Sequence, residues 1–94
     1  MTVDRLKQII IPILQNHGII RAGLFGSYVK DEQTEESDID ILVELSKKIS
    51  LLEFVRIKLD LEDKLNKKVD LVEYQAIKPR LKDRILSEEV RIYG

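Results

Sequence analysis

Two apolar segments joined by a polar stretch constrain the fold of this chain more than any other feature. Residues 19–25 are mostly apolar and run into Gly26 and Ser27. After ten intervening residues, Asp38 and Asp40 open a second apolar run. The pattern predicts one strand that delivers Gly-Ser to a turn and another that begins with two carboxylates. Because side chains alternate along a strand, Asp38 and Asp40 are expected on the same face.

Paired carboxylates of this kind indicate a cation site. Like charges side by side raise each other's pKa, and a hard divalent ion such as Mg²⁺ neutralises them through oxygen ligands. Asp70 is a third candidate, because it interrupts an apolar strand over residues 69–74 and is costly to bury unless paired or metal-bound. Two bland alternatives stay open, namely solvated residues at a strand start and a salt bridge from Asp70 to Lys67 or Lys68.

The rest of the chain alternates between helical and strand patterns. Pro12 lies inside the first helical pattern and predicts a kink or break near Ile11. Ser50 and Glu53 form a capping box that opens a second helix ending near residue 65, and Pro79 opens the last helix. The strands are expected at residues 19–25, 39–45, 69–74 and, at a sheet edge, 90–93. The predicted class is α/β or α+β, a small mixed sheet flanked by helices, with residues 1–94 forming one domain.

Apolar residues on the second predicted helix cover more than half of its circumference. One face of a sheet cannot bury all of them, so part of this helix either meets a partner or is covered by the first or last helix. Both interpretations stay open. The residues concerned are Leu51, Leu52, Phe54, Val55, Ile57, Leu59, Leu61 and Leu65.

Composition excludes several classes of protein. The 94 residues include no cysteine and one histidine, which excludes disulfides, zinc–thiolate sites and multi-histidine metal sites. A net charge of −1 argues against direct nucleic-acid binding. No apolar run approaches the ~20 residues of a membrane span, so we expect a cytoplasmic protein.

Taken together, the motifs predict an active site for nucleotidyl transfer. Asp38, Asp40 and Asp70 would hold one or two Mg²⁺ ions, and the Gly-Ser turn would hold the outer phosphates of a nucleoside triphosphate. Asp70 suits the role of second-ion ligand or general base toward an attacking hydroxyl. Taken alone, Gly26-Ser27 is also an ordinary turn.

These motifs resemble the signature of the polymerase-beta-type nucleotidyltransferases and, more narrowly, of the minimal nucleotidyltransferases known as MntA-type antitoxins. The resemblance implies a nucleotidyltransferase fold with ATP as substrate and two Mg²⁺ ions. It implies that Gly26 and Ser27 contact the triphosphate, and that Asp38, Asp40 and Asp70 are metal ligands and catalytic residues. It also implies a HEPN-domain ribonuclease toxin as partner, silenced by transfer of AMP onto one of its tyrosines.

The sequence departs from this family near the turn. Relatives often carry a basic residue followed by glycine where Lys30 and Asp31 stand, and some carry arginine at the position of Tyr28. Lys30 can still bind phosphate as a point charge, whereas Asp31 is expected to reduce nucleotide affinity. Two alternatives to a protein adenylyltransferase remain: a non-catalytic antitoxin that occludes the toxin, and a nucleotidyltransferase acting on RNA or a small molecule. Larger relatives hold the acceptor of the nucleotidyl group with a further domain. Here we expect another chain, or a second copy of this chain, to present the acceptor. A homodimer therefore stays open.

Overall fold

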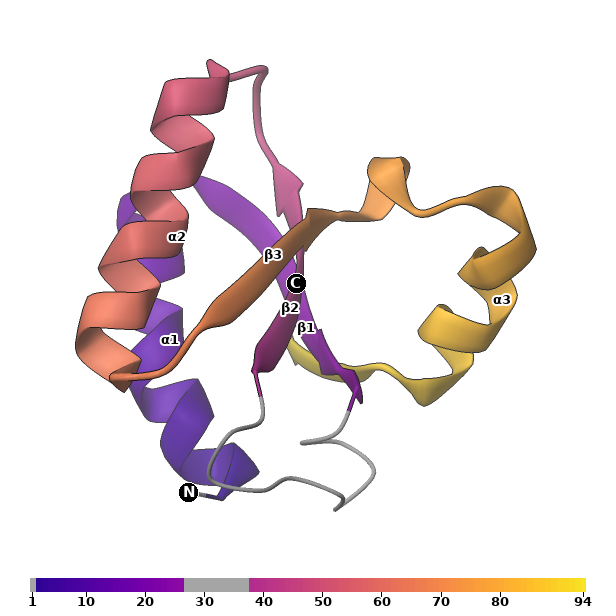
Figure 1. Ribbon diagram of the computed structural model, residues 1–94, viewed down its shortest axis with the longest axis horizontal. Helices are drawn as coiled ribbons and strands as arrows, with labels where there is room; N and C mark the ends of the chain where they lie inside the picture. The colour runs from indigo at the N-terminus through magenta and orange to yellow at the C-terminus, as the bar shows by residue number, and fades with distance from the viewer. Residues whose placement is uncertain (1, 27–37) are drawn as a thin grey trace.

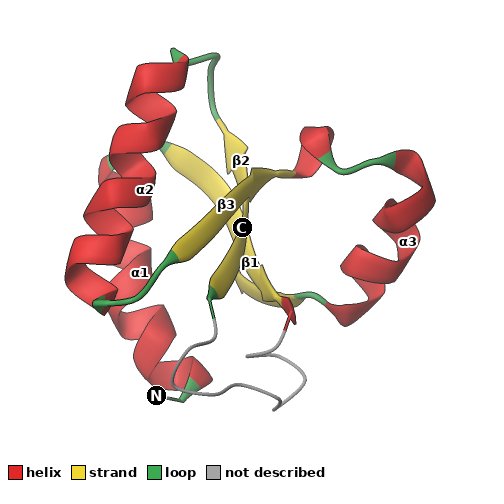
Figure 2. Cartoon of the chain, in the orientation of Figure 1, coloured by secondary structure: helices red, strands yellow, loops and turns green. Residues whose placement is uncertain are grey.

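The computed structural model describes residues 2–26 and 38–94, which form a mixed sheet with helices on both faces (Figures 1 and 2). The strands lie in the order β3-β2-β1-β4. β1 pairs antiparallel with β2 and with β4, whereas β2 and β3 are parallel. The predicted fold class is therefore confirmed, and the apolar strand β2 is central as its pattern indicates. The element bounds are α1 Val3–Asn16, β1 Ile19–Phe25, β2 Ile39–Leu45, α2 Leu51–Leu65, β3 Val69–Glu73, η2 Tyr74–Ala76, α3 Pro79–Glu88 and β4 Val90–Tyr93.

The main core lies between one face of the sheet and the helices α1 and α2. Leu6, Ile10 and Leu14 of α1 recur at helical spacing and are fully buried. Ile57 and Leu61 of α2 are also fully buried in this core. The opposite face carries a smaller cluster that packs against α3 (Figure 1).

Helix α1 runs without a break through Pro12, so the break predicted near Ile11 is wrong. Proline removes one backbone hydrogen bond from a helix interior. Ile10 and Leu14 are buried on either side of Pro12, and their packing on the sheet holds the helix together across it. The helix ends with His17 as its C-cap and Gly18 at φ +77°. His17 Nε2 lies 2.9 Å from Oδ2 of Asp60, which joins the end of α1 to α2.

Helix α2 begins at the predicted cap. Ser50 Oγ accepts a hydrogen bond of 3.1 Å from the backbone N–H of Glu53. The helix ends at Asn66, whose left-handed φ of 55° is one that asparagine tolerates. The last strand before α3 ends one residue earlier than predicted, because Tyr74 begins the short helix η2.

Helix α3 begins at Pro79 as predicted but has no fully buried residue. Ile85 and Leu86 pack on the smaller cluster, which consists of Leu42, Tyr74 and Ile77. Among the helices of residues 2–26 and 38–94, none is long and apolar enough to cross a bilayer.

Candidate active site

The parallel pairing of β2 with β3 brings Asp40 and Asp70 together. The register places Asp40 opposite Asp70, one residue after the buried pair Ile39 and Val69. The N–H of Ile39 donates to the carbonyl of Lys68 at 2.9 Å and supports this register. Residues opposite each other on adjacent strands point to the same face, so the two carboxylates are neighbours.

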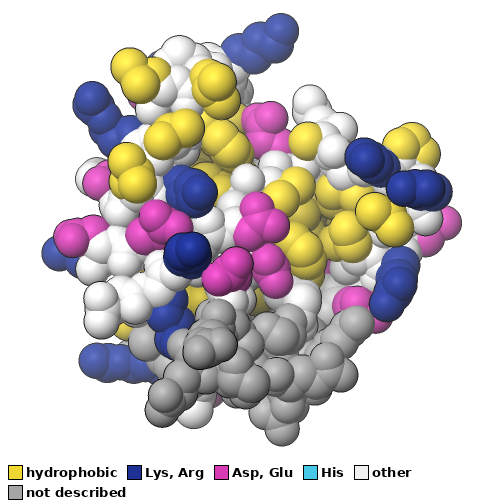
Figure 3. Space-filling view, viewed as in Figure 1, with side chains coloured by type: hydrophobic (Ala, Val, Ile, Leu, Met, Phe, Trp, Pro, Cys, Tyr) yellow, Lys and Arg dark blue, Asp and Glu magenta, His cyan; other side chains and the backbone are white. Residues whose placement is uncertain are grey.

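Asp38 completes an acidic group at the start of β2. Burial, followed by the negative charges of Asp70 and Asp38, raises the pKa of Asp40 to about 6. Asp40 is partly buried, while Asp38 and Asp70 are exposed. Figure 3 shows acidic side chains gathered over the middle of the face in view. The arrangement concentrates negative charge and favours a bound cation.

The donor set suits a hard divalent ion, but the carboxylates do not form a ready-made cage. Within residues 2–26 and 38–94, no three Asp, Glu, His or Cys side chains converge closely enough to hold a metal ion. Carboxylate oxygens are nevertheless the ligands that Mg²⁺ takes, alongside water and phosphate oxygens. A cation here would require the exposed side chains of Asp38 and Asp70 to turn toward Asp40.

Gly26 lies directly beside Asp40. Its φ of +79° is one that glycine adopts without strain, and a Cβ atom at this position would overlap the carboxylate of Asp40. Phe25, the preceding residue, pairs with Asp40 in the sheet. The end of β1 and the start of β2 therefore meet at one point, as the sequence predicts. Ser27 and Lys30 lie outside the described residues.

Sequence reasoning missed a second polar cluster on the same face as Asp40, at the other end of β2. The guanidinium carbon of Arg21 lies 4.1 Å from the ring centroid of Tyr74, and Nη1 of Arg21 lies 3.6 Å from Oε1 of Glu44. The Tyr74 hydroxyl donates to the buried carboxylate of Glu89. Burial and this bond to Glu89 raise the pKa of Tyr74 to about 12. An arginine inside an apolar strand was the available signal, but its partners come from distant segments.

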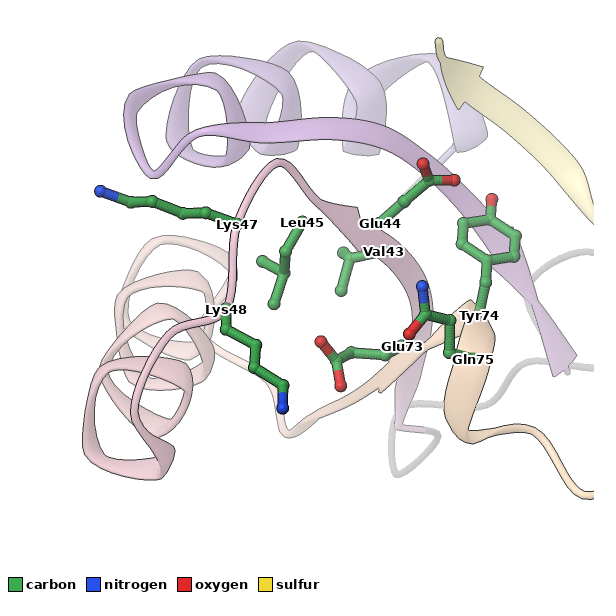
Figure 4. A pocket seen from close by; sticks show the side chains of 8 residues that line it. All are labelled: Val43, Glu44, Leu45, Lys47, Lys48, Glu73, Tyr74 and Gln75. Atoms are coloured by element: carbon green, nitrogen blue, oxygen red, sulfur yellow. The ribbon is translucent and has the colours of Figure 1, made fainter.

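Two hollows of the described surface lie away from the acidic group. A cavity of about 170 Å³ is formed where β2 and β3 end, and Figure 4 shows Lys47, Lys48 and Glu73 around it. A hollow of about 470 Å³ lies beside His17 at the end of α1. Asp40 is at the start of β2 and lines neither hollow. The candidate site is therefore identified by its chemistry and register rather than by concavity.

A glycine turn at the end of one strand, facing carboxylates at the start of two others, defines a nucleotidyltransferase class of protein. The chain matches the model of the family described as polymerase beta, nucleotidyltransferase, over residues 8–94, and it belongs to that family. The predictions of an enzyme and of a nucleotidyltransferase are thus confirmed.

Three comparisons give the closer context. A relative from Methanocaldococcus jannaschii, named as a candidate protein adenylyltransferase, is 53% identical over 92 residues, covering 98% of this chain and 99% of the relative. The solved structure of a candidate minimal nucleotidyltransferase is 33% identical with a TM-score of 0.81, covering 96% of this chain and 95% of that one. A toxin–antitoxin structure with AMP-PNP is 26% identical with a TM-score of 0.83, covering 94% of this chain and 73% of that one.

Proposed function

We propose that this chain is the antitoxin of a HEPN/MNT pair. It transfers AMP from ATP to a tyrosine of its HEPN ribonuclease toxin and requires Mg²⁺. Residues 1–94 form one catalytic domain. The observation that carries the proposal is the in-register placement of Asp40 opposite Asp70 beside Gly26. Support for a protein acceptor comes from the 53% identical relative named as a candidate protein adenylyltransferase. Support for a toxin partner and for a nucleotide comes from the similar toxin–antitoxin structure with AMP-PNP.

The proposed chemistry assigns a role to each carboxylate. Asp38, Asp40 and Asp70 would hold Mg²⁺, which supplies charge neutralisation for the triphosphate and for the pyrophosphate leaving group. The tyrosine oxygen forms a bond to the α-phosphorus while the bond to pyrophosphate breaks. Asp70 is exposed and can accept the proton from the attacking hydroxyl.

The nucleotide would meet the turn that follows β1. Because Gly26 lacks a Cβ, Asp40 packs directly against it, and a triphosphate held at Asp40 through Mg²⁺ would lie close to the Gly26 backbone. Ser27 would add a hydroxyl donor and Lys30 a positive charge, and these two contacts rest on the sequence pattern alone. The cytoplasmic location expected from composition also stays a prediction.

The test is an intact-mass measurement on both chains after incubation with isotope-labelled ATP, Mg²⁺ and the HEPN protein encoded by the adjacent gene. We expect the mass of AMP to appear on the toxin with the wild-type chain and with Asp83→Asn, an exposed control on α3. Asp38→Asn and Asp40→Asn should abolish the transfer, and chelation of Mg²⁺ should do the same. Transfer that persists in Asp40→Asn would contradict the proposed site.

A second candidate function is a binding antitoxin that occludes the toxin without modifying it. The similar structure of a toxin–antitoxin complex supports a toxin partner with or without modification of the toxin. A toxin that gains no mass but loses its ribonuclease activity at equimolar Asp38→Asn/Asp40→Asn would support occlusion. Loss of neutralisation in the same double variant, with the complex intact, would support the enzyme.

A further inference from the structure

Four large apolar side chains form a continuous exposed stripe along α2. Leu51 and Leu52 are 78% and 75% exposed, Leu59 is 56% exposed and Val55 is 39% exposed. Leu51, Val55 and Leu59 are spaced four residues apart and therefore line up on one side of the helix. Figure 3 shows hydrophobic side chains gathered over α2. We call these four residues the α2 stripe.

The structure also corrects the extent of the partner surface expected on this helix. Ile57 and Leu61, which the apolar pattern alone cannot separate from the stripe, are fully buried in the core. The core therefore accounts for only part of the apolar circumference, and α1 and α3 do not cover the rest.

We propose that the α2 stripe is the interface of a twofold homodimer in which two copies of α2 pack antiparallel about Val55. This register sets Leu51 of each copy against Leu59 of the other and covers both ends of the stripe at once. If the stripe of one copy packed on a different surface of the other, the second stripe would remain exposed. A twofold axis buries the stripes of both copies with the same contacts.

Charges around the stripe fit a second copy in this orientation. Lys47 and Lys48 precede the helix and outnumber Glu53 of its first turn, whereas Glu62 and Asp63 outnumber Lys64 in its last turn. The register about Val55 brings the basic start of one copy beside the acidic end of the other. Lys47, Lys48 and Asp63 are exposed. A parallel pair would instead place like charges together, which costs affinity.

The dimer leaves the proposed active site accessible. Helix α2 covers one face of the sheet, and Asp40 lies on the face that carries Leu42 and α3. The proposal is therefore independent of the proposed function. The stripe has only four residues, whereas a standard interface has about 20–30 residues a side, so we expect a dissociation constant in the micromolar range.

Sedimentation velocity of the full chain from about 1 µM to about 500 µM tests the dimer. We expect the wild-type chain to shift from monomer to dimer across this range. Val55→Asp, which places two carboxylates at the twofold axis, should stay monomeric to the top of the range. Because Val55 is outside the core, circular dichroism should show this variant folded, and AMP transfer to the toxin should be retained. Monomer at every concentration for the wild-type chain, or dimer for folded Val55→Asp, would overturn the proposal.

A charge-swap pair tests the antiparallel orientation. Lys47→Glu alone places a glutamate of one copy beside Asp63 of the other at both ends of the interface. Asp63→Lys alone places a lysine of one copy beside Lys47 of the other. Each variant should dimerise at least several-fold more weakly than the wild-type chain. An equimolar mixture of the two should dimerise more strongly than either alone, because both ends then carry opposite charges. A mixture no stronger than its components would exclude this register.

Discussion

Replacing Asp40 with asparagine should make the Mg²⁺-free protein more stable while removing its proposed activity. Asparagine has nearly the shape of aspartate and removes the charge that burial, Asp70 and Asp38 all disfavour. The wild-type carboxylate is thus retained at a cost to stability.

The pKa of Asp40 sets the size of this cost. It rises from 3.8 to about 6 in the folded protein. At 1.36 kcal/mol per pKa unit, the ionised carboxylate would destabilise the fold by about 3 kcal/mol at neutral pH. Asp40 is only partly buried, so solvent screening reduces this figure to about 1–2 kcal/mol.

The stability gained by Asp40→Asn should depend on pH, and the raised pKa of Asp40 sets the direction of this dependence. Below pH 3.8 Asp40 is largely neutral in both the folded and the unfolded chain, and it imposes no penalty. As the pH rises from 3.8 to about 6, the unfolded chain ionises this carboxyl while the folded protein keeps it protonated, so stability falls across this range and levels off above it. The free energy of unfolding of Asp40→Asn should therefore exceed that of the wild-type chain most at pH 7 to 8, and the two values should converge near pH 4.

Urea denaturation followed by circular dichroism, with EDTA present, measures this difference. We expect the free energy of unfolding of Asp40→Asn to exceed the wild-type value by about 1–2 kcal/mol at pH 7.5, with no gain for the control Asp83→Asn. Added Mg²⁺ should stabilise the wild-type chain and not Asp40→Asn, since the proposed Mg²⁺ site requires the Asp40 carboxylate. An Asp40→Asn protein no more stable than the wild-type chain at pH 7.5 would refute the electrostatic reasoning.

Three further predictions test other parts of the structure. Gly26→Ala should destabilise the fold by about 1–3 kcal/mol in thermal unfolding, because φ is positive there and the new Cβ overlaps Asp40; an unchanged melting temperature would show that the turn relaxes. Leu61→Ala should cost about 2–5 kcal/mol by opening a core cavity, whereas Leu59→Ala on the same helix should cost under about 0.5 kcal/mol in the monomer; equal costs would contradict the assigned faces of α2. Tyr74→Phe should cost about 1–3 kcal/mol because it leaves the buried carboxylate of Glu89 without its hydroxyl donor, and denaturant midpoints would reveal a smaller effect if water replaces it.

Local sequence signals predicted most of the fold because they act over a few residues. Alternation and capping chemistry located β1, β2, both ends of α2 and the start of α3, since each depends on neighbouring side chains and backbone groups. Pro12 shows the limit of such signals. The local rule predicts a break, but the burial of Ile10 and Leu14 on the sheet outweighs the lost hydrogen bond.

The sequence by itself determined the chemistry available to this protein: a glycine turn, two carboxylates at alternate positions of a strand and a third in another strand. Only the tertiary structure decided that Asp70 stands opposite Asp40, because the register of parallel strands far apart in sequence is set by the buried pair Ile39 and Val69. It also decided which apolar residues of α2 enter the core. A helical repeat gives each residue a direction, but the surfaces packed around the helix decide which directions are buried.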